Sequence, residues 1–115
     1  MKIVLLADTV PTRTKGLMFH KPLEMDECAF FIFPAEGRHT FWNKNVDFPI
    51  SLLFCDKHGE IQDIKYLEKQ QEQPIVGDHN KILYVIETHY DFPKKNKIEQ
   101  GKKMKVVNKE ILFSV

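Results

Sequence analysis

The chain has 115 residues, of which 43% are hydrophobic and 29% charged, and its formal net charge at pH 7 is +1. This balance is typical of one folded domain with a single core, and it excludes a long disordered or fibrous protein. The apolar run near the start, "IVLLA", is too short for a signal-peptide core or a membrane span. We therefore predict a single cytoplasmic domain over residues 1–115.

The near-zero net charge hides an uneven distribution. Residues 94–115 contain seven Lys and two Glu, whereas residues 1–93 contain ten basic and fourteen acidic residues. A basic segment can bind an anion or nucleic acid, here through Lys94–Lys109, but Lys also commonly protects an exposed sheet edge. We favour the solvated edge, since no aromatic residue is interleaved within 94–109 to stack on bases.

The cysteines and histidines lack the spacing of a metal site. Cys28 and Cys55 belong to no CxxC motif, and each lies in or beside an apolar run, which is typical of a buried reduced thiol. The five histidines are scattered, with no two at i and i+2 or i+4. We therefore predict surface histidines, no metal and no cofactor.

A short helix is predicted close to the start of the chain. Asp8 or Thr9 can cap its beginning, Pro11 suits its first turn, and Gly16 should end it. The apolar residues 17–19 that follow should then return their side chains to the core.

Apolar runs elsewhere predict strands bounded by Gly, Pro and charged residues. The hairpin over residues 54–66 is the clearest, because two apolar runs flank a turn at Gly59. Residues 68–80 predict an exposed loop, and residues 89–101 suggest a helical turn or two. The other strands or extended segments are predicted at residues 2–7, 28–34, 41–49, 50–56, 81–88, 102–107 and 110–115.

Strands outnumber helices in this pattern and do not alternate with long helices, so a doubly wound parallel sheet is not expected. No internal repeat or linker divides the chain. The sequence predicts a mainly β (α+β) fold, a small, mostly antiparallel, barrel-like sheet of about six or seven short strands with one or two short helices.

The segment "FWNKN" at residues 41–45 raises the first functional question. Phe41 is predicted to lie in the core. Trp42, the only tryptophan, is predicted to lie partly in the core and partly in the wall of a site, since its indole N–H needs a partner. Lys44 and Asn45 could bind polar groups of a ligand over Trp42. Alternatively, residues 43–45 form only a polar turn, and the residues themselves do not decide between the two.

Three charged residues add to the candidate site. Glu87 and Asp8 each end a predicted strand and could act as a general acid and base, although Asp8 can equally cap the helix and Glu87 can pair with a cation. Arg13 could bind an anion through its planar guanidinium group. A structural salt bridge from Arg13 to Glu87 or Asp8 is the favoured alternative.

Taken in order, several segments resemble domain of unknown function family 192. They are "ADTVPTRTKGLMFHKPL", "FFIFP", "FWNKNVDFPISLLFCDKHGEI" and "YVIETHYDFPKKNKIEQGKKMKV", and together they span nearly the whole chain. The resemblance implies a compact, mainly β, barrel-like domain and supplies no activity. The family's most characteristic polar and aromatic positions fall on Arg13, Gly16, Met18, Trp42, Lys44, Asn45 and Glu87.

Two departures from the family pattern bear on a site. Asn43 stands where relatives usually have Met, and Ser51 stands where many have Asp. A site that uses either position is expected to be altered in this chain.

We predict a non-catalytic module that binds a small molecule or a sugar through Arg13, Trp42, Lys44, Asn45 and Glu87. A protein-interaction or accessory module, with the basic end and residues 68–80 as its surfaces, is the alternative. A hydrolase that uses Glu87 or Asp8 with Lys44 is less favoured, because no nucleophile with an adjacent base is visible. No membrane partner is expected.

Overall fold

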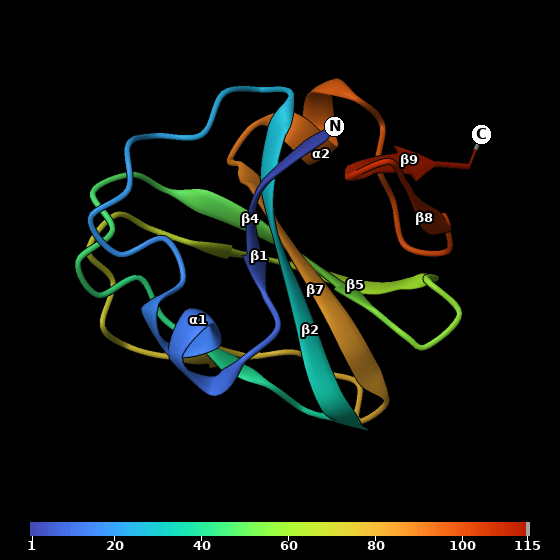
Figure 1. Ribbon diagram of the computed structural model, residues 1–115, viewed down its shortest axis with the longest axis horizontal. Helices are drawn as coiled ribbons and strands as arrows, with labels where there is room; N and C mark the ends of the chain where they lie inside the picture. Colours follow the sequence, from blue (N-terminus) through green and yellow to red (C-terminus); the bar gives the residue numbers. More distant parts are fainter. Residues whose placement is uncertain (115) are drawn as a thin grey trace.

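The computed structural model describes residues 1–114 and contains a curved seven-stranded sheet, a two-stranded sheet and two short helices (Figure 1). The strands follow the order β5-β4-β7-β2-β1-β9-β8 in the large sheet and β3-β6 in the small one. Val115, at the end of the last predicted strand, lies outside the described residues. In chain order the elements are β1 (Lys2–Ala7), α1 (Val10–Lys15), β2 (Glu27–Gly37), β3 (Thr40–Phe41), β4 (Ile50–Cys55), β5 (Ile61–Leu67), β6 (Ile75–Val76), β7 (Ile82–His89), α2 (Phe92–Lys95), β8 (Met104–Val107) and β9 (Glu110–Phe113).

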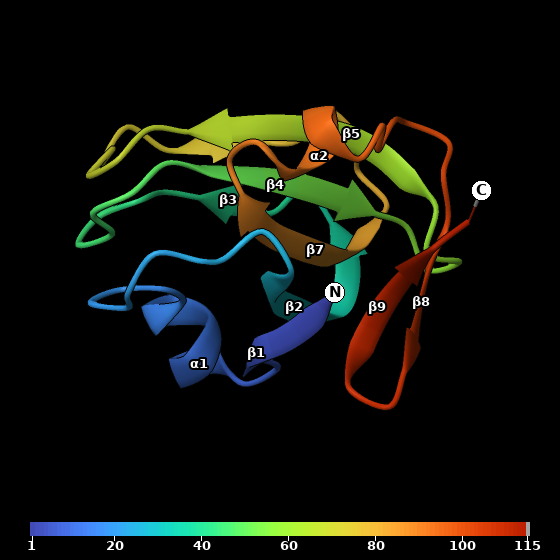
Figure 2. The same cartoon turned by 90° about the horizontal axis from the view of Figure 1, so that it is seen from above.

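The large sheet is mostly antiparallel, with one parallel pair, β1 and β2. It forms a half-barrel. The β8–β9 hairpin curls round until Lys103 makes a bridge with Glu60, beside the opposite edge strand, β5 (Figure 2). The predicted mainly β, barrel-like fold with short helices is therefore confirmed.

Strand β4 explains why the apolar runs of this sequence are continuous rather than alternating. All its residues are buried, and alternate side chains enter different cores. Leu52 and Phe54 pack in the core beneath α1, whereas Leu53 and Cys55 pack in the core beneath α2 and the β8–β9 hairpin. A strand covered on both faces needs apolar residues at every position.

Helix α1 begins and ends where the sequence predicted. Thr9, not Asp8, is its N-cap: the Thr9 hydroxyl accepts from the Thr12 N–H at 3.2 Å, and the Thr12 hydroxyl accepts from the Thr9 N–H at 2.9 Å. This reciprocal pair satisfies backbone donors at the helix start. Gly16 ends the helix with φ at +49°, a conformation that favours glycine.

The predicted hairpin is formed by β4 and β5, and its turn is fixed by Asp56 and Gly59. One carboxylate oxygen of Asp56 accepts from the His58 N–H at 2.9 Å and from the Glu60 N–H at 3.0 Å. Gly59 has φ at +82°, and a Cβ there would lie 2.5 Å from the carbonyl oxygen of Met104. Glycine is thus required both by the turn and by the close approach of β8.

Three local predictions were wrong. Phe19 does not return to the core: its φ is +62°, its N–H donates to the Asn45 carbonyl at 2.8 Å, and its side chain is 80% exposed. The loop at 68–80 is not wholly exposed, because β6 pairs with β3 and Ile75 packs against the core. His39 is half-buried rather than on the surface, since its ring stacks on Phe33.

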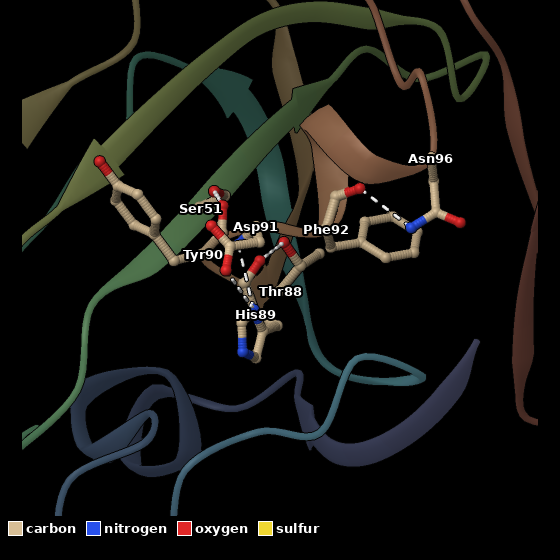
Figure 3. A network of polar contacts seen from close by, with 7 residues as sticks. All are labelled: Ser51, Thr88, His89, Tyr90, Asp91, Phe92 and Asn96. Atoms are coloured by element: carbon tan, nitrogen blue, oxygen red, sulfur yellow. Dashed lines mark hydrogen bonds and ion pairs between the residues drawn. The ribbon is translucent and has the colours of Figure 1, made fainter.

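Polar groups at the junction of β7 and α2 are satisfied by the backbone (Figure 3). The Ser51 hydroxyl donates to the Tyr90 carbonyl at 2.7 Å, and the Thr88 hydroxyl donates to the His89 carbonyl at 2.9 Å. Ser51 and Thr88 are buried, so these bonds offset the cost of removing their hydroxyls from water. Ser51 therefore has a structural role in this chain.

Both cysteines are buried free thiols, as predicted, and burial raises the pKa of each to about 12. No helix within residues 1–114 combines the length and hydrophobicity needed to cross a membrane.

Candidate functional site

A cavity of about 260 Å³ lies between α1, the loop that follows it, β2 and the segment around β3. Four of the five predicted binding residues line it, namely Arg13, Trp42, Lys44 and Glu87. Because α1, the "FWNKN" segment and β7 are distant in sequence, only the fold brings these side chains together. The full lining is Arg13, Thr14, Lys15, Gly16, Leu17, Met18, Phe31, Phe33, Thr40, Phe41, Trp42, Asn43, Lys44, Val46 and Glu87.

The "FWNKN" segment contributes a wall, a cation and a structural turn. Trp42 is 43% exposed, and the Lys44 ammonium lies 5.4 Å from the centre of its ring, within cation–π range. Asn43 is buried, and its side-chain amide donates to the carbonyls of Phe48 and Glu68, each at 3.0 Å. Residues 41–45 therefore serve both as structure and as cavity lining.

Asn45 is the predicted site residue that the cavity does not include. It has φ at +61°, and its carbonyl accepts from the Phe19 N–H. It lies in the polar turn that was the alternative interpretation of residues 43–45. Its predicted role in ligand binding has no geometric support from the cavity.

Arg13 reaches back from α1 onto the sheet. Its guanidinium donates to the Ile32 carbonyl at 2.9 Å and lies 5.5 Å from the centre of the Phe33 ring. His39 stacks on Phe33 with ring centres 3.7 Å apart, and burial lowers the His39 pKa, which favours the neutral imidazole. The arginine is thus held in place by neutral groups.

Glu87 is the buried acid of the cavity. It is 4% exposed, and its cross-strand neighbours are Ala29 on β2 and Leu52 on β4, which offer no hydrogen bond from their side chains. Burial raises the pKa of Glu87 to about 8. At pH 7 the side chain is therefore mainly a neutral carboxylic acid, which can donate a hydrogen bond.

The structural salt bridge expected for Arg13 is absent: within residues 1–114, neither Glu87 nor Asp8 forms an ion pair with it. Asp8 is exposed at the end of β1 and does not line the cavity. The suggested Glu87–Asp8 acid and base pair is therefore not assembled at this site.

The sequence prediction missed two kinds of cavity residue. Phe31 and Phe33 form apolar wall, and Lys15 adds a third cation at the end of α1. The i and i+2 spacing of the two phenylalanines within one strand places them on the same face, which is a signal that could have found them. Lys15 carried no signal, because a lysine in the last helical turn is also explained by the helix dipole.

The cavity therefore offers cations, an aromatic wall and a neutral acid. Among residues 1–114, no group of three His, Cys, Asp or Glu side chains could hold a metal ion. The available chemistry is recognition of a negative group by Arg13, Lys15 and Lys44, contact with an apolar ring, and one hydrogen bond donated by Glu87.

Residues 3–106 match the model of the DUF192 family, described as an uncharacterized ACR, and the chain belongs to this family. Among curated proteins, no relative of this chain was found. The resemblance drawn from the sequence segments is thereby confirmed.

Two crystal structures share the fold. A protein of unknown function from Novosphingobium aromaticivorans has a TM-score of 0.80 and 26% identity, with 85% of this chain and 70% of that chain covered. A protein from Sinorhizobium meliloti, described as a "putative transcription regulator", has a TM-score of 0.81 and 25% identity, with 85% and 76% covered. These likenesses support the same mainly β architecture.

Proposed function

We propose that this protein is a non-catalytic module that binds a small acidic molecule, with a sugar acid as the best candidate. The observation that carries the proposal is the convergence of Arg13, Trp42, Lys44 and Glu87 on one cavity. Its volume of about 260 Å³ suits a ligand the size of one sugar ring rather than a polymer.

Each part of the cavity matches one part of such a ligand. The cations Arg13, Lys15 and Lys44 can bind a carboxylate, and charged hydrogen bonds of this kind are the strong ones. Phe33 and Trp42 offer aromatic surface to the apolar face of a ring. The protonated carboxyl of Glu87 can donate to a ring hydroxyl.

The first experiment follows Trp42 fluorescence, since it is the only tryptophan in the chain. Glucuronate and galacturonate are titrated beside glucose and galactose, and calorimetry supplies a second reading. We expect the acids to change the emission and protect it from iodide quenching, with the neutral sugars binding at least about tenfold more weakly.

Matched variants test the two cations. Lys44→Ala and Arg13→Lys should each weaken binding by about tenfold or more, because a charged hydrogen bond is lost or loses its bidentate form. Lys81→Ala and Arg38→Lys, which alter residues outside the cavity, should bind like the wild type. If none of the four sugars binds in either measurement, or if the acids and the neutral sugars bind equally, the proposal is refuted.

The pH dependence tests the role of Glu87. Raising the pH through about 8 ionises this carboxyl, which removes its donor and places a negative charge beside the anionic ligand. Affinity should therefore fall above pH 8 in the wild type. It should stay nearly constant in Glu87→Gln, whose amide still donates a hydrogen bond.

A second candidate is a protein-interaction module, and one specific observation favours it. Phe19 is held 80% exposed by a backbone with φ at +62°, an unusual conformation for a bulky residue. Its backbone hydrogen bond to Asn45 fixes it beside the loop that carries Trp42. Affinity capture with the wild type and Phe19→Ser should then differ by one specific protein, whereas Val10→Ser, another exposed apolar residue, should leave capture unchanged.

A further inference from the structure

A second and larger cavity, the hairpin groove, lies on the other face of the sheet. It has a volume of about 750 Å³ and runs between β1, β2 and β7 on one side and the β8–β9 hairpin on the other. Figure 2 shows this hairpin standing away from the sheet, on the side opposite α1. The lining residues are Ile3, Val4, Leu6, Phe30, Ile32, Lys57, His58, Gly59, Tyr84, Met104, Lys105, Val106 and Lys109.

The walls of the hairpin groove are apolar and partly exposed to solvent. Leu6 on β1 and Val106 on β8 are each 46% exposed, so large aliphatic side chains face water across the groove. Phe30 and Tyr84 also line the groove, and their rings stack with centres 5.6 Å apart. Covering this surface with an apolar group would remove it from water, which favours formation of a complex.

The charged groups of the hairpin groove all have the same sign. Lys57, Lys105 and Lys109 line it, together with His58, and no acidic residue among residues 1–114 does. None of the three lysines takes part in an ion pair within residues 1–114. The groove therefore complements a molecule that has an apolar body and a negative end.

The groove is fixed by the backbone at both ends of the hairpin. The Met104 N–H donates to the Gly59 carbonyl at 2.9 Å, and the Ile3 N–H donates to the Lys109 carbonyl at 3.1 Å. Asn108 and Lys109 both have positive φ, as a tight two-residue hairpin turn requires. A preformed groove of this kind binds without the cost of ordering its walls.

An added peptide strand fits this groove poorly. The bridge between Lys103 and Glu60 already occupies the start of the β8 edge, which leaves residues 105–107 for pairing. Lysine on such an edge also opposes strand addition. A lipid within a bilayer fits poorly too, because the apolar walls are recessed between sheet and hairpin and the lipid would have to leave the membrane.

We propose that the hairpin groove binds a free, single-chain amphiphile with an anionic head, with its chain between Leu6, Val106 and the Phe30–Tyr84 pair and its head on Lys105 and Lys109. The volume of about 750 Å³ lies within the usual range for small-molecule pockets. The ligand class follows from the apolar walls and from the uniform positive charge.

Decanoate, used below its micelle concentration, is the probe. Calorimetry should detect binding, and methyl NMR signals of Ile3, Leu6, Ile32 and Val106 should shift together. The uncharged 1-decanol should bind at least about tenfold more weakly, and raising the salt concentration should weaken decanoate but not decanol. Equal binding of the two compounds would refute recognition of the head group.

Matched variants decide whether the groove is the site. Val106→Asn should weaken decanoate binding by about tenfold, since it removes an apolar contact. Val107→Asn, which changes the next residue on β8 at a similar exposure outside the groove, should have no effect. Lys105→Glu should weaken binding by at least tenfold, and Lys94→Glu on α2 should not. Binding that is the same in all four variants would overturn the proposal.

Two further outcomes would also overturn it. One is sedimentation of the wild type with phosphatidylglycerol vesicles, and not with phosphatidylcholine, in the absence of decanoate binding, since the lipid surface would then be the partner. The other is capture of an acidic peptide without decanoate binding. Absence of decanoate binding would not affect the sugar-acid proposal. Trp42 does not line the hairpin groove, so its fluorescence should not report decanoate binding.

Discussion

The two faces of the central sheet are built by the same strands, yet their ionisable side chains differ in burial. On the α1 face, Glu87 is buried at a small cavity and is held neutral at pH 7. On the hairpin face, the charged side chains Lys57, Lys105 and Lys109 line a large and mainly apolar groove. One face thus buries an acid, whereas the other exposes apolar surface.

This difference shows that the extent to which a sheet face is covered determines which of its side chains lose contact with water. On the α1 face, the helix and the loops on either side of β3 complete a closed core, so a polar side chain there loses water and shifts its pKa. The β8–β9 hairpin closes its face only partly, so apolar side chains there remain wet. The predictions below test this contrast, starting with the largest expected effect.

Substitutions at two neighbouring residues of β4 compare how much each core contributes to stability. Phe54 points into the α1-side core, where its ring meets Phe41 edge-on at 5.9 Å, and Phe54→Ala should lower the free energy of unfolding by about 3–5 kcal/mol. Cys55 points into the other core, and Cys55→Ala removes one atom, for a loss of about 1 kcal/mol. Urea unfolding measures both, and equal losses would contradict the packing described.

The buried acid predicts a specific dependence of stability on pH. Its pKa is about 8 in the folded chain and 4.5 as a free group, so this contribution to stability is complete below pH 4.5 and is lost as the pH rises to 8. The loss should be about 1.4 kcal/mol per pH unit within that interval. Glu87→Gln should remove the slope, and its unfolding energy should exceed that of the wild type above pH 8.

The control for this experiment is Glu72→Gln, which alters an exposed acid and should keep the slope of the wild type. A wild-type stability that does not change between pH 5 and pH 8 would show that Glu87 ionises like an exposed acid. The contrast between the two faces would then fail.

Two glycines test how the hairpin face is held. Gly59→Ala should cost about 2–3 kcal/mol, because the residue has positive φ and its new Cβ would meet the Met104 carbonyl. Gly101→Ala has a similar φ of +97° but open space around its Cβ, so we expect about 1 kcal/mol. Thermal unfolding of both variants gives the difference, and an equal cost would mean that the close contact has no effect.

The smallest expected effect concerns the helix that covers the other face. Thr9→Ala removes the side chain that caps α1 and should cost about 1 kcal/mol. Thr9→Ser keeps a hydroxyl and should recover most of that loss. If chemical denaturation finds the two variants equally unstable, the hydroxyl is not the source of the effect.

Much of the local structure could be read from the sequence, because it depends on neighbours in the chain. Thr9, Pro11 and Gly16 define α1 through capping and turn chemistry that acts within a few residues. The nearly continuous apolar run of β4 indicated a strand. Phe19 was misplaced because a local apolar signal cannot reveal that Asn45, distant in sequence, would accept its N–H.

The candidate site was predictable as a list and not as an arrangement. The residue types of Arg13, Trp42, Lys44 and Glu87 suggested binding, but the sequence could not show that they share a cavity or that Asn45 does not. The missing salt bridge of Arg13 and the raised pKa of Glu87 were equally hidden. The pKa of Glu87 depends on which side chains lie opposite it on other strands, here Ala29 and Leu52.

The sequence by itself determined the family, the strand-rich fold class, the capped helix and the tight turns. These follow from the backbone preferences of single residues and from the period of apolar side chains. Only the tertiary structure decided which face each acid or lysine occupies, which groups lose water and where two cavities form. Burial and convergence depend on the packing of segments far apart in the chain, and no local pattern encodes that packing.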